Sequence, residues 1–424
     1  MERWKLNLRA LRRARASSSR TKALPEEPDV IARRGVRASL RPGAAPGAAR
    51  LASPASMRIS VPTETAPRER RVALPPDSAG RLVKSGLEVA VQRGAGQNAG
   101  FRDDAYTAVG AIIVPDADTL LSSGQVVVKV QPPSAAEIAK LREGASLISL
   151  MRPGQHQETA AALALRQVNA LALELVPRIT RAQSMDVLSS QSTVAGYKAA
   201  LLGAAELGKF LPMLTTAAGN ISPARVFIIG AGVSGLQAIA TARRLGGVVS
   251  AFDVRPAARE QVQSLGASFV ATELVSASAE AAGGYARAQT NEEQQRTHAA
   301  IAGHIKDVDL VITTAQIPGR RAPTLVTSEM VKTMRAGSVI VDLAVESGGN
   351  CELSKVGETV HAHDVTIMGP VNLPSSVAYH ASQMFGRNIL ALLQHLVKDG
   401  TLTIDPADEI TGAMLIVHQG KVLK

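Results

Sequence analysis

A glycine-rich turn in the second half of the chain has the spacing of a phosphate-binding loop. Gly230, Gly232 and Gly235 follow the apolar run 226–229 and precede an alanine-rich segment. In a strand–turn–helix unit the first glycine permits the tight turn, the second lets the backbone approach a pyrophosphate, and the third lets helix and strand pack closely. The helix N-terminus also offers free N–H groups to phosphates. The pattern predicts a bound dinucleotide.

An acidic residue follows where the ribose of such a nucleotide would lie. Asp253 ends the next apolar run, 248–252. A carboxylate at this place accepts hydrogen bonds from a free 2′-hydroxyl and repels a 2′-phosphate, which favours NAD over NADP. Arg255, two residues later, is a mild signal in the opposite direction. The alternative is a glycine turn in an α/β fold that holds no ligand.

A dense polar segment, residues 177–190, follows another buried strand. Loops at the ends of parallel strands are where α/β sheets place ligand-contacting groups. Gln183 could hydrogen-bond a carboxamide, and Arg178 with Asp186 could form an orienting ion pair. A loop that merely caps the next helix, with Ser192 as the cap, is the alternative, and spacing alone does not decide between them.

Three other features could take part in chemistry. Lys129 lies in an apolar strand and, if buried, needs either a substrate carboxylate or an internal ion pair. Cys351 is the single cysteine, which excludes an internal disulfide and fits a reducing compartment; we expect a structural thiol, because no activating base is identifiable. His361 and His363 share one face of a predicted strand, but no third ligand is readable, so no metal site is predicted.

The segment Gly283-Gly284-Tyr285 lies in a long polar stretch between strands. Its two glycines are typical of a hinge, and the stretch suits a mobile lid over a ligand. A linker without fixed structure is the alternative.

Alternating apolar strands and helices must position these residues. The strands predicted before the long helix are 59–61, 88–92, 111–113, 125–130, 146–150 and 170–175, and those after it are 226–229, 248–252, 268–271, 310–313, 338–342 and 366–368. The main predicted helices are 78–85, 192–210 and 376–397. This alternation predicts an α/β fold with two Rossmann-like domains, parallel sheets and an interdomain cleft. We assign residues 57–190 and 377–424 to the first domain and 191–376 to the NAD-binding domain.

Length and charge agree with this organisation. A chain of 424 residues is too long for one ordinary core. Its net charge of +11 is concentrated in residues 1–56, and with only 3% aromatic residues we exclude nucleic-acid binding. We expect that basic extension to be disordered; an upstream start, a targeting peptide and a functional arm all remain open. No apolar run is long enough to span a membrane.

Together these motifs resemble the soluble NAD(H)-binding component (domain I, the alpha subunit) of proton-translocating NAD(P) transhydrogenase. That family is related to alanine dehydrogenase. The likeness runs from Met57 to Lys424 and includes the motifs above. It also includes three shorter segments: Val61-Pro62 with Glu64, Arg70 to Ala73, and Asp342 to Ala344.

The resemblance implies a set of site residues. Arg178, Gln183, Asp186 and Ser189 would hold the nicotinamide end of NAD(H), and Tyr285 would lie on a loop that closes over the nucleotide. The other cofactor-binding residues that it implies are Ile179, Thr180, Gly230, Gly232, Val233, Gly235, Asp253, Val254, Arg255, Gly284 and Gln316. Thr297 stands where we expect a glutamine.

Acid–base chemistry separates the two related activities. An alanine dehydrogenase must move protons as well as hydride, so it needs a general acid or base. In that family a histidine follows the lysine strand and an aspartate lies four residues after the Asp-x-Ala aspartate. Here residues 147–154 contain no histidine, and the later position is Glu346. Hydride exchange between two nicotinamide rings needs only aligned C4 atoms at roughly 3–3.5 Å.

The resemblance therefore implies that the chain binds NADH and passes hydride to NADP⁺ on a partner subunit, as a Re/Si-specific transhydrogenase. A separate membrane component would couple this step to proton translocation. The implied partners are membrane-spanning and NADP-binding subunits and a second copy of the chain, with a cytoplasmic location at the inner membrane. The alternatives are an amino-acid dehydrogenase of the alanine dehydrogenase type and a non-catalytic NAD-binding module.

Overall fold

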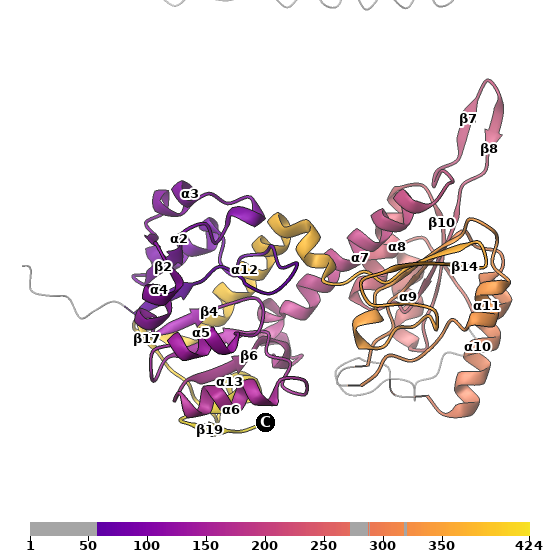
Figure 1. Cartoon of the computed structure of the whole chain (residues 1–424). Coiled ribbons are helices and arrows are strands. Elements are labelled where there is room, and N and C mark those ends of the chain that lie inside the picture. The colour runs from indigo at the N-terminus through magenta and orange to yellow at the C-terminus, as the bar shows by residue number, and fades with distance from the viewer. Residues whose placement is uncertain (1–56, 272–286, 288, 318–319) are drawn as a thin grey trace, which may run out of the picture. The chain divides into compact units, whose positions relative to one another are not determined.

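The structure is a computed structural model that describes residues 57–271, 287, 289–317 and 320–424 (Figure 1). The predictions for residues 1–56 and for the Gly283–Tyr285 segment fall outside these ranges. Two large parallel-rich sheets with flanking helices make up the described residues. This confirms the predicted α/β class with parallel sheets; the exact domain boundaries stay a prediction.

The first sheet has eight strands in the order β19-β18-β6-β5-β4-β1-β2-β3. The strands β1 to β6 pair in parallel, and β18 pairs antiparallel with β6 and with β19. The C-terminal segment thus extends the sheet that the N-terminal segment begins. The strand bounds are β1 (Arg58–Val61), β2 (Glu88–Gln92), β3 (Ile112–Val114), β4 (Val126–Val128), β5 (Ser146–Ser149), β6 (Asn169–Ala172), β18 (Leu415–His418) and β19 (Lys421–Val422).

Helices from both ends of the chain cover this sheet. The long helix α12 buries Phe385 and Ile389 in the same apolar cluster as Ile59 of β1. That packing explains why the last segment of the chain belongs with the first sheet. The helix bounds are α2 (Pro76–Lys84), α3 (Asp103–Ala108), α4 (Ala117–Ser123), α5 (Ala135–Lys140), α6 (Gln157–Leu165), α12 (Ala378–Leu396) and α13 (Glu409–Met414).

The second sheet has seven strands in the order β11-β10-β9-β12-β13-β15-β14, and β14 alone runs antiparallel to its neighbour in the described residues. Val226 and Ile228 of β9 lie in one apolar cluster, whereas Phe227 and Ile229 lie in another. Because helices cover both faces, the strand is a continuous apolar run and does not alternate with polar residues. The strand bounds are β9 (Arg225–Ile229), β10 (Val248–Phe252), β11 (Ser268–Phe269), β12 (Leu310–Thr313), β13 (Val339–Asp342), β14 (Thr359–Ala362) and β15 (Val365–Met368); the helices are α8 (Val233–Arg244), α9 (Pro256–Ser264), α10 (Asn291–Ile305) and α11 (Ser328–Lys332).

The helix α7 (Val187–Glu206) connects the two sheets and contributes to both cores (Figure 1). Val187, in its first turn, packs in the cluster of the first sheet, while Ala199 packs in the cluster of the second. Its middle lies directly on α8: a Cβ atom added to Gly196 would lie 2.0 Å from the carbonyl oxygen of Ser234. Glycine is therefore required at this crossing of two helices.

Two hairpins complete the described elements. The hairpin of β7 (Leu214–Thr216) and β8 (Gly219–Ile221) projects from the second sheet and has mostly exposed residues (Figure 1). The strands β16 (Val397–Lys398) and β17 (Thr401–Leu402) form the other.

Several predicted element ends were wrong. The helix predicted at 192–210 begins at Val187, because Asp186 caps it by accepting a hydrogen bond from Ser189 N at 2.9 Å. Ser192 therefore lies inside the helix. The strand predicted at 170–175 ends at Ala172, and residues 173–175 form a 3₁₀ turn. His363 lies beyond β14 with a φ of 53°, so it does not share a strand face with His361.

Candidate functional site

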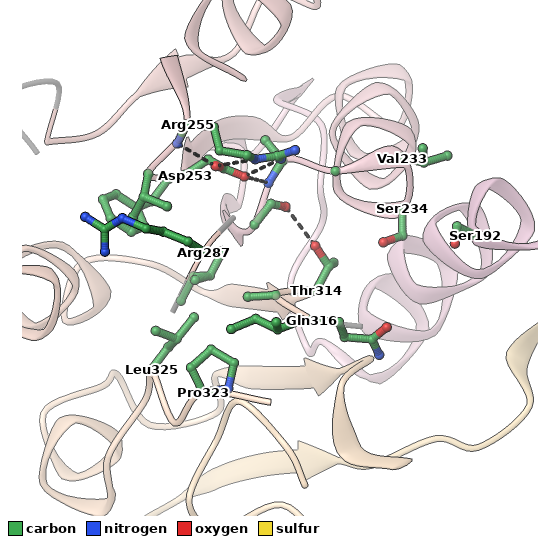
Figure 2. Close-up of a pocket in the computed structure, with 18 of the residues that line it drawn as sticks. Ser192, Val233, Ser234, Asp253, Arg255, Arg287, Thr314, Gln316, Pro323 and Leu325 are labelled. Atoms are coloured by element: carbon green, nitrogen blue, oxygen red, sulfur yellow. Dashed lines mark hydrogen bonds and ion pairs between the residues drawn. The ribbon is translucent and has the colours of Figure 1, made fainter. Parts of the chain in front are cut away.

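A cavity of about 550 Å³ lies at the carboxyl ends of the second sheet's strands (Figure 2). Gly230 follows β9, Asp253 follows β10 and Thr314 follows β12, and all three line it. Because these strands are parallel neighbours, their carboxyl ends meet at one edge of the sheet, where ligands bind in folds of this class. The volume is that of an ordinary small-molecule or cofactor site.

The glycine turn has the geometry that its spacing predicted. Gly230 has a φ of 96°, which L side chains rarely adopt. A Cβ at Gly235 would lie 1.9 Å from the carbonyl oxygen of Gly230, so the third glycine is required for close packing. A Cβ at Gly232 would meet no atom within 4 Å, so this glycine faces open space at the start of α8. Open space beside free helix N–H groups suits a pyrophosphate.

Asp253 is only 7% exposed, and both of its oxygens already accept hydrogen bonds (Figure 2). Ala231 N donates at 2.8 Å, and Arg255 donates from its backbone N and Nε at 2.9 Å and from a terminal nitrogen at 2.8 Å. A carboxylate has about four acceptor positions, so these bonds use them all. A ribose hydroxyl that bonded to Asp253 would have to replace one of the donors from Arg255.

The polar loop before α7 reaches the cavity through some of its predicted residues. Arg178 and Ser189 line the cavity, whereas Gln183 lies exposed on the 3₁₀ helix η3 (Thr180–Met185). Asp186 accepts hydrogen bonds from Ser189 N at 2.9 Å and Ser189 Oγ at 2.6 Å. Asp186 therefore both caps α7 and orients Ser189, and its pairing with Arg178 stays a prediction.

The remaining predicted residues divide in the same way. Val233, Val254 and Gln316 line the cavity, and Gln316 donates a hydrogen bond to Leu343 O at 3.0 Å. Residues outside the cavity wall are Ile179, Thr180, Gln183, Asp186 and Gly235. Gly284 and Tyr285 fall outside the described residues.

A buried polar network that the sequence analysis missed supports one wall of the cavity. Asp342, fully buried at the end of β13, accepts hydrogen bonds from Thr313 Oγ1, Ala344 N, Asn350 N and Cys351 N at 2.8–3.0 Å. The Asn350 side chain then bonds to Ala315 N and O at 2.9 Å and to Pro323 O at 2.8 Å. Ala315 and Pro323 line the cavity. The Asp-x-Ala motif pointed to this region, but no sequence signal identified Asn350.

Positive charge dominates the cavity wall. The ionisable residues among the described lining are Asp253 and five arginines: Arg178, Arg255, Arg287, Arg320 and Arg321. An excess of arginine suits a ligand with two phosphate charges. Thr297 also lines the cavity and accepts a hydrogen bond from Gln289 Nε2 at 3.0 Å, so it takes part in the wall despite the expected glutamine.

Lys129 is a member of an internal ion-pair cluster in the first sheet. Its side chain is 1% exposed, and its Nζ lies 2.6 Å from Glu137 Oε1 and 3.5 Å from Glu64 Oε2. Burial alone would lower the pKa of Lys129, but the two carboxylates raise it, so the amine is charged. Burial raises the pKa of Glu64. Of the two roles considered for Lys129, the structure supports the structural ion pair.

Cys351 is 2% exposed, and burial raises the pKa of its thiol to about 11. Thiolate is the reactive form, so we expect the native protein to react with a disulfide reagent at pH 8 at least about 100-fold more slowly than the guanidinium-unfolded chain. Absorbance of the released thiolate measures both rates. Rapid native reaction would contradict a structural role for this thiol.

Comparison with known proteins gives the class of the chain. The model of the alanine dehydrogenase/PNT C-terminal domain matches residues 199–424, and that of the N-terminal domain matches residues 60–195. The fold and the glycine turn agree with both, and the chain belongs to the alanine dehydrogenase/PNT family.

Within this family the chain is most clearly similar to transhydrogenase alpha subunits. It is 47% identical over 375 residues to an NAD(P) transhydrogenase subunit alpha chain of Rhodospirillum rubrum, covering 87% of this chain and 98% of that one. The crystal structure of transhydrogenase from Sinorhizobium meliloti is 44% identical, with a TM-score of 0.79 over 86% of this chain and 100% of that one. The alanine dehydrogenase of Halomonas elongata is 30% identical over 375 residues, covering 86% of this chain and 94% of that one. These likenesses confirm the predicted resemblance and support nicotinamide-dinucleotide binding and a role in NAD(P) transhydrogenation.

Among the described residues, no helix is both long and apolar enough to cross a membrane.

Proposed function

We propose that the cavity binds NADH and that the chain presents it for direct hydride transfer to NADP⁺ on a separate subunit. The observation that carries this proposal is the chemistry of the described cavity wall. It offers glycine-turn amides, arginines and amides, but its one carboxylate, Asp253, is held by four hydrogen bonds. Hydride exchange between nicotinamides needs binding and alignment and no acid or base.

Each wall of the cavity has a role in this proposal. The turn at Gly230–Gly235 and the N-terminus of α8 bind the pyrophosphate, and Asp253 orients the ribose. Arg178 and Ser189 lie at the nicotinamide end, with Ser189 held by Asp186. NADH, when bound, would supply the hydride; the chain's own task is to orient the ring and leave one face accessible. The exposed Gln183 would contact the carboxamide at the rim.

The same proposal places the chain among further subunits. The name "subunit alpha" of the relatives supports partner subunits, and we propose that these bind NADP(H), span the inner membrane and couple transfer to proton translocation. The chain itself would lie on the cytoplasmic side, attached through those partners. Transfer from NADH to an NADP analogue, in membranes reconstituted with the partner subunits, tests the proposal; its absence under conditions where NADH binds would overturn it.

Gln183→Ala should separate presentation from binding. We expect hydride transfer to fall about 100-fold, because one orienting hydrogen bond to the reacting end is lost, while the Kd for NADH changes less than about threefold. Rapid-mixing rates and fluorescence titration measure the two quantities. Ser184→Ala, at the neighbouring exposed position of η3, is the matched control and should change neither. Equal losses of transfer and binding in the glutamine variant would show that the loop only binds.

An amino-acid dehydrogenase of the alanine dehydrogenase type is the competing enzyme activity. The buried Lys129 disfavours it, because Glu64 and Glu137 already occupy the cation that a substrate carboxylate would need. Glu346 accepts a hydrogen bond from Asn372 N at 3.2 Å and is not among the residues of the cavity wall. Robust pyruvate- and ammonium-dependent NADH oxidation by the purified chain would favour the dehydrogenase. NADH binding without transfer in the reconstituted system would favour a non-catalytic module.

We also propose a homodimer, with the β7–β8 hairpin in its interface. Large apolar side chains are exposed on the hairpin and just before it: Phe210 (56%), Met213 (65%) and Ile221 (43%). Exposed apolar side chains gathered on one projecting element are typical of an interaction surface.

Replacing Met213 and Ile221 together with serine should convert a dimer to a monomer at micromolar concentration, as measured by light scattering during gel filtration. Leu165→Ser is the matched control, because Leu165 is 87% exposed on α6, away from the hairpin in sequence. A dimer that survives the double change, or a wild-type monomer, would contradict the assignment.

A further inference from the structure

A buried ion pair before α2 contacts both segments that connect the two sheets. Glu69 and Arg71 are 6% and 4% exposed, and a terminal nitrogen of Arg71 lies 2.7 Å from Glu69 Oε2. The other terminal nitrogen donates to Gln191 Oε1 at 2.8 Å, and the first also donates to Asn372 Oδ1 at 3.1 Å. Gln191 belongs to α7, the outgoing connection, and Asn372 belongs to the returning connection between β15 and α12.

The carboxylate of the pair contacts the same connection a second time. Glu69 accepts hydrogen bonds from Asn372 Nδ2 at 3.1 Å and from Gln131 Nε2 at 2.8 Å, the latter in the loop after β4. Burial alone would raise the pKa of Glu69, but the hydrogen bonds and charge of Arg71 lower it to about 2. The pair is therefore fully ionised under all physiological conditions, and its contacts do not depend on pH there.

The backbone around the pair is fastened to the returning connection as well. Arg70 N donates to Ser375 Oγ at 2.7 Å, and the same hydroxyl donates to Arg68 O at 2.8 Å. Val72 N donates to Ser382 Oγ at 3.0 Å. Residues 68–72 thus form a hydrogen-bonded clasp on the segment that leads from the second sheet back to the first.

Both clasped connections continue directly into the candidate site. The first turns of α7 carry Ser189 and Ser192, which line the cavity, on either side of Gln191. Asn372, at the other connection, donates through its backbone to Glu346, four residues after Asp342. Glu69 and Arg71 do not line the cavity themselves. A change in the clasp would reach the nucleotide only through the connections.

We propose that Glu69 and Arg71 are positioning residues, which fix the two connecting segments relative to each other and thereby set the orientation in which bound NADH meets the NADP-binding subunit. This inference rests on the proposed function. The planar guanidinium suits the task, because its fixed fork of donors bonds to three partners at once. Buried ion pairs often add little net stability, so a role in specifying geometry is a better account of this one.

Two glutamines give a matched test. Gln191 and Gln131 are 8% and 7% exposed, and each makes one hydrogen bond to the pair, but only Gln191 belongs to a connecting segment. Gln191→Met should slow single-turnover hydride transfer at saturating NADH about tenfold, while the Kd for NADH changes less than about twofold, because a small misplacement of reacting groups is costly. Gln131→Met should leave both values within about twofold of wild type.

A distance measurement makes the test independent of activity. Spin labels on cysteines introduced at Arg81 of α2 and Arg296 of α10, whose side chains are 59% and 60% exposed, report on the two sheets. Pulsed dipolar spectroscopy should show a broader distance distribution in Gln191→Met than in wild type or Gln131→Met. Unchanged distributions, or equal slowing of transfer by both variants, would overturn the inference. Broadening in a protein whose wild type transfers no hydride would keep the clasp and reject the proposed function.

Discussion

Gly196→Ala is expected to lower the free energy of unfolding by about 3 kcal/mol and to weaken NADH binding at least about tenfold. The added methyl group would lie 2.0 Å from the carbonyl oxygen of Ser234 and 2.9 Å from its Cα. These are backbone atoms of α8, so no side-chain rotation relieves the overlap and the helices must separate. Because α7 carries Ser189 and α8 begins at the glycine turn, separation moves one wall of the cavity away from the other.

Chemical denaturation and NADH titration measure these effects. Gly303→Ala is the matched control, since Gly303 lies in α10 and a Cβ there would meet no atom within 4 Å. That variant should be more stable than wild type by up to about 1 kcal/mol, because alanine favours helix. A Gly196→Ala protein as stable as wild type would show that the α7–α8 contact is looser than the structure has it.

Asp342→Asn should cost about 2–3 kcal/mol of stability and weaken NADH binding, although the two side chains have nearly the same shape. Every acceptor position of the Asp342 carboxylate is used, three of them by backbone N–H groups. An amide group has one oxygen, so in either orientation at least one buried N–H loses its partner. The loss also releases Asn350, which holds the cavity wall at Ala315 and Pro323.

The control for this change is Asp307→Asn, because the Asp307 side chain is 53% exposed and pairs with Arg335 at the surface. Its effect should be below about 0.5 kcal/mol. Denaturation midpoints and NADH titration again provide the measurements. If both asparagine variants behave alike, the buried network does not support the cavity.

Much of the fold was predictable because its strands are uninterrupted apolar runs between turn residues. The predicted strands 88–92, 248–252 and 310–313 have the observed bounds. Helix starts were harder, since Asp186 and Ser192 are both good capping residues. The choice between them depends on Val187, which is buried in the first core, and that burial is a tertiary effect that local sequence does not contain.

The candidate site was predictable where its residues are close in sequence. The turn at Gly230–Gly235 and the acid after β10 belong to one strand–helix–strand unit, so their spacing was informative. Thr314 and Asn350 contact the same region from other strands, and their bonds depend on the order β9-β12-β13 in the sheet. Sequence spacing did not reveal that Arg255 would occupy the acceptors of Asp253 either, because the pairing depends on how the arginine side chain folds back.

The helix α7 also limits how the length of this chain can change in evolution or design. Each residue added to an α-helix turns everything beyond it by about 100°. An insertion between Ser192 and Gly196 would therefore leave Val187 in the first core but rotate Gly196 and Ala199 away from α8 and the second core. Substitutions on the exposed side of α7 can accumulate freely, whereas its residue count between these two anchors is fixed by helical phase.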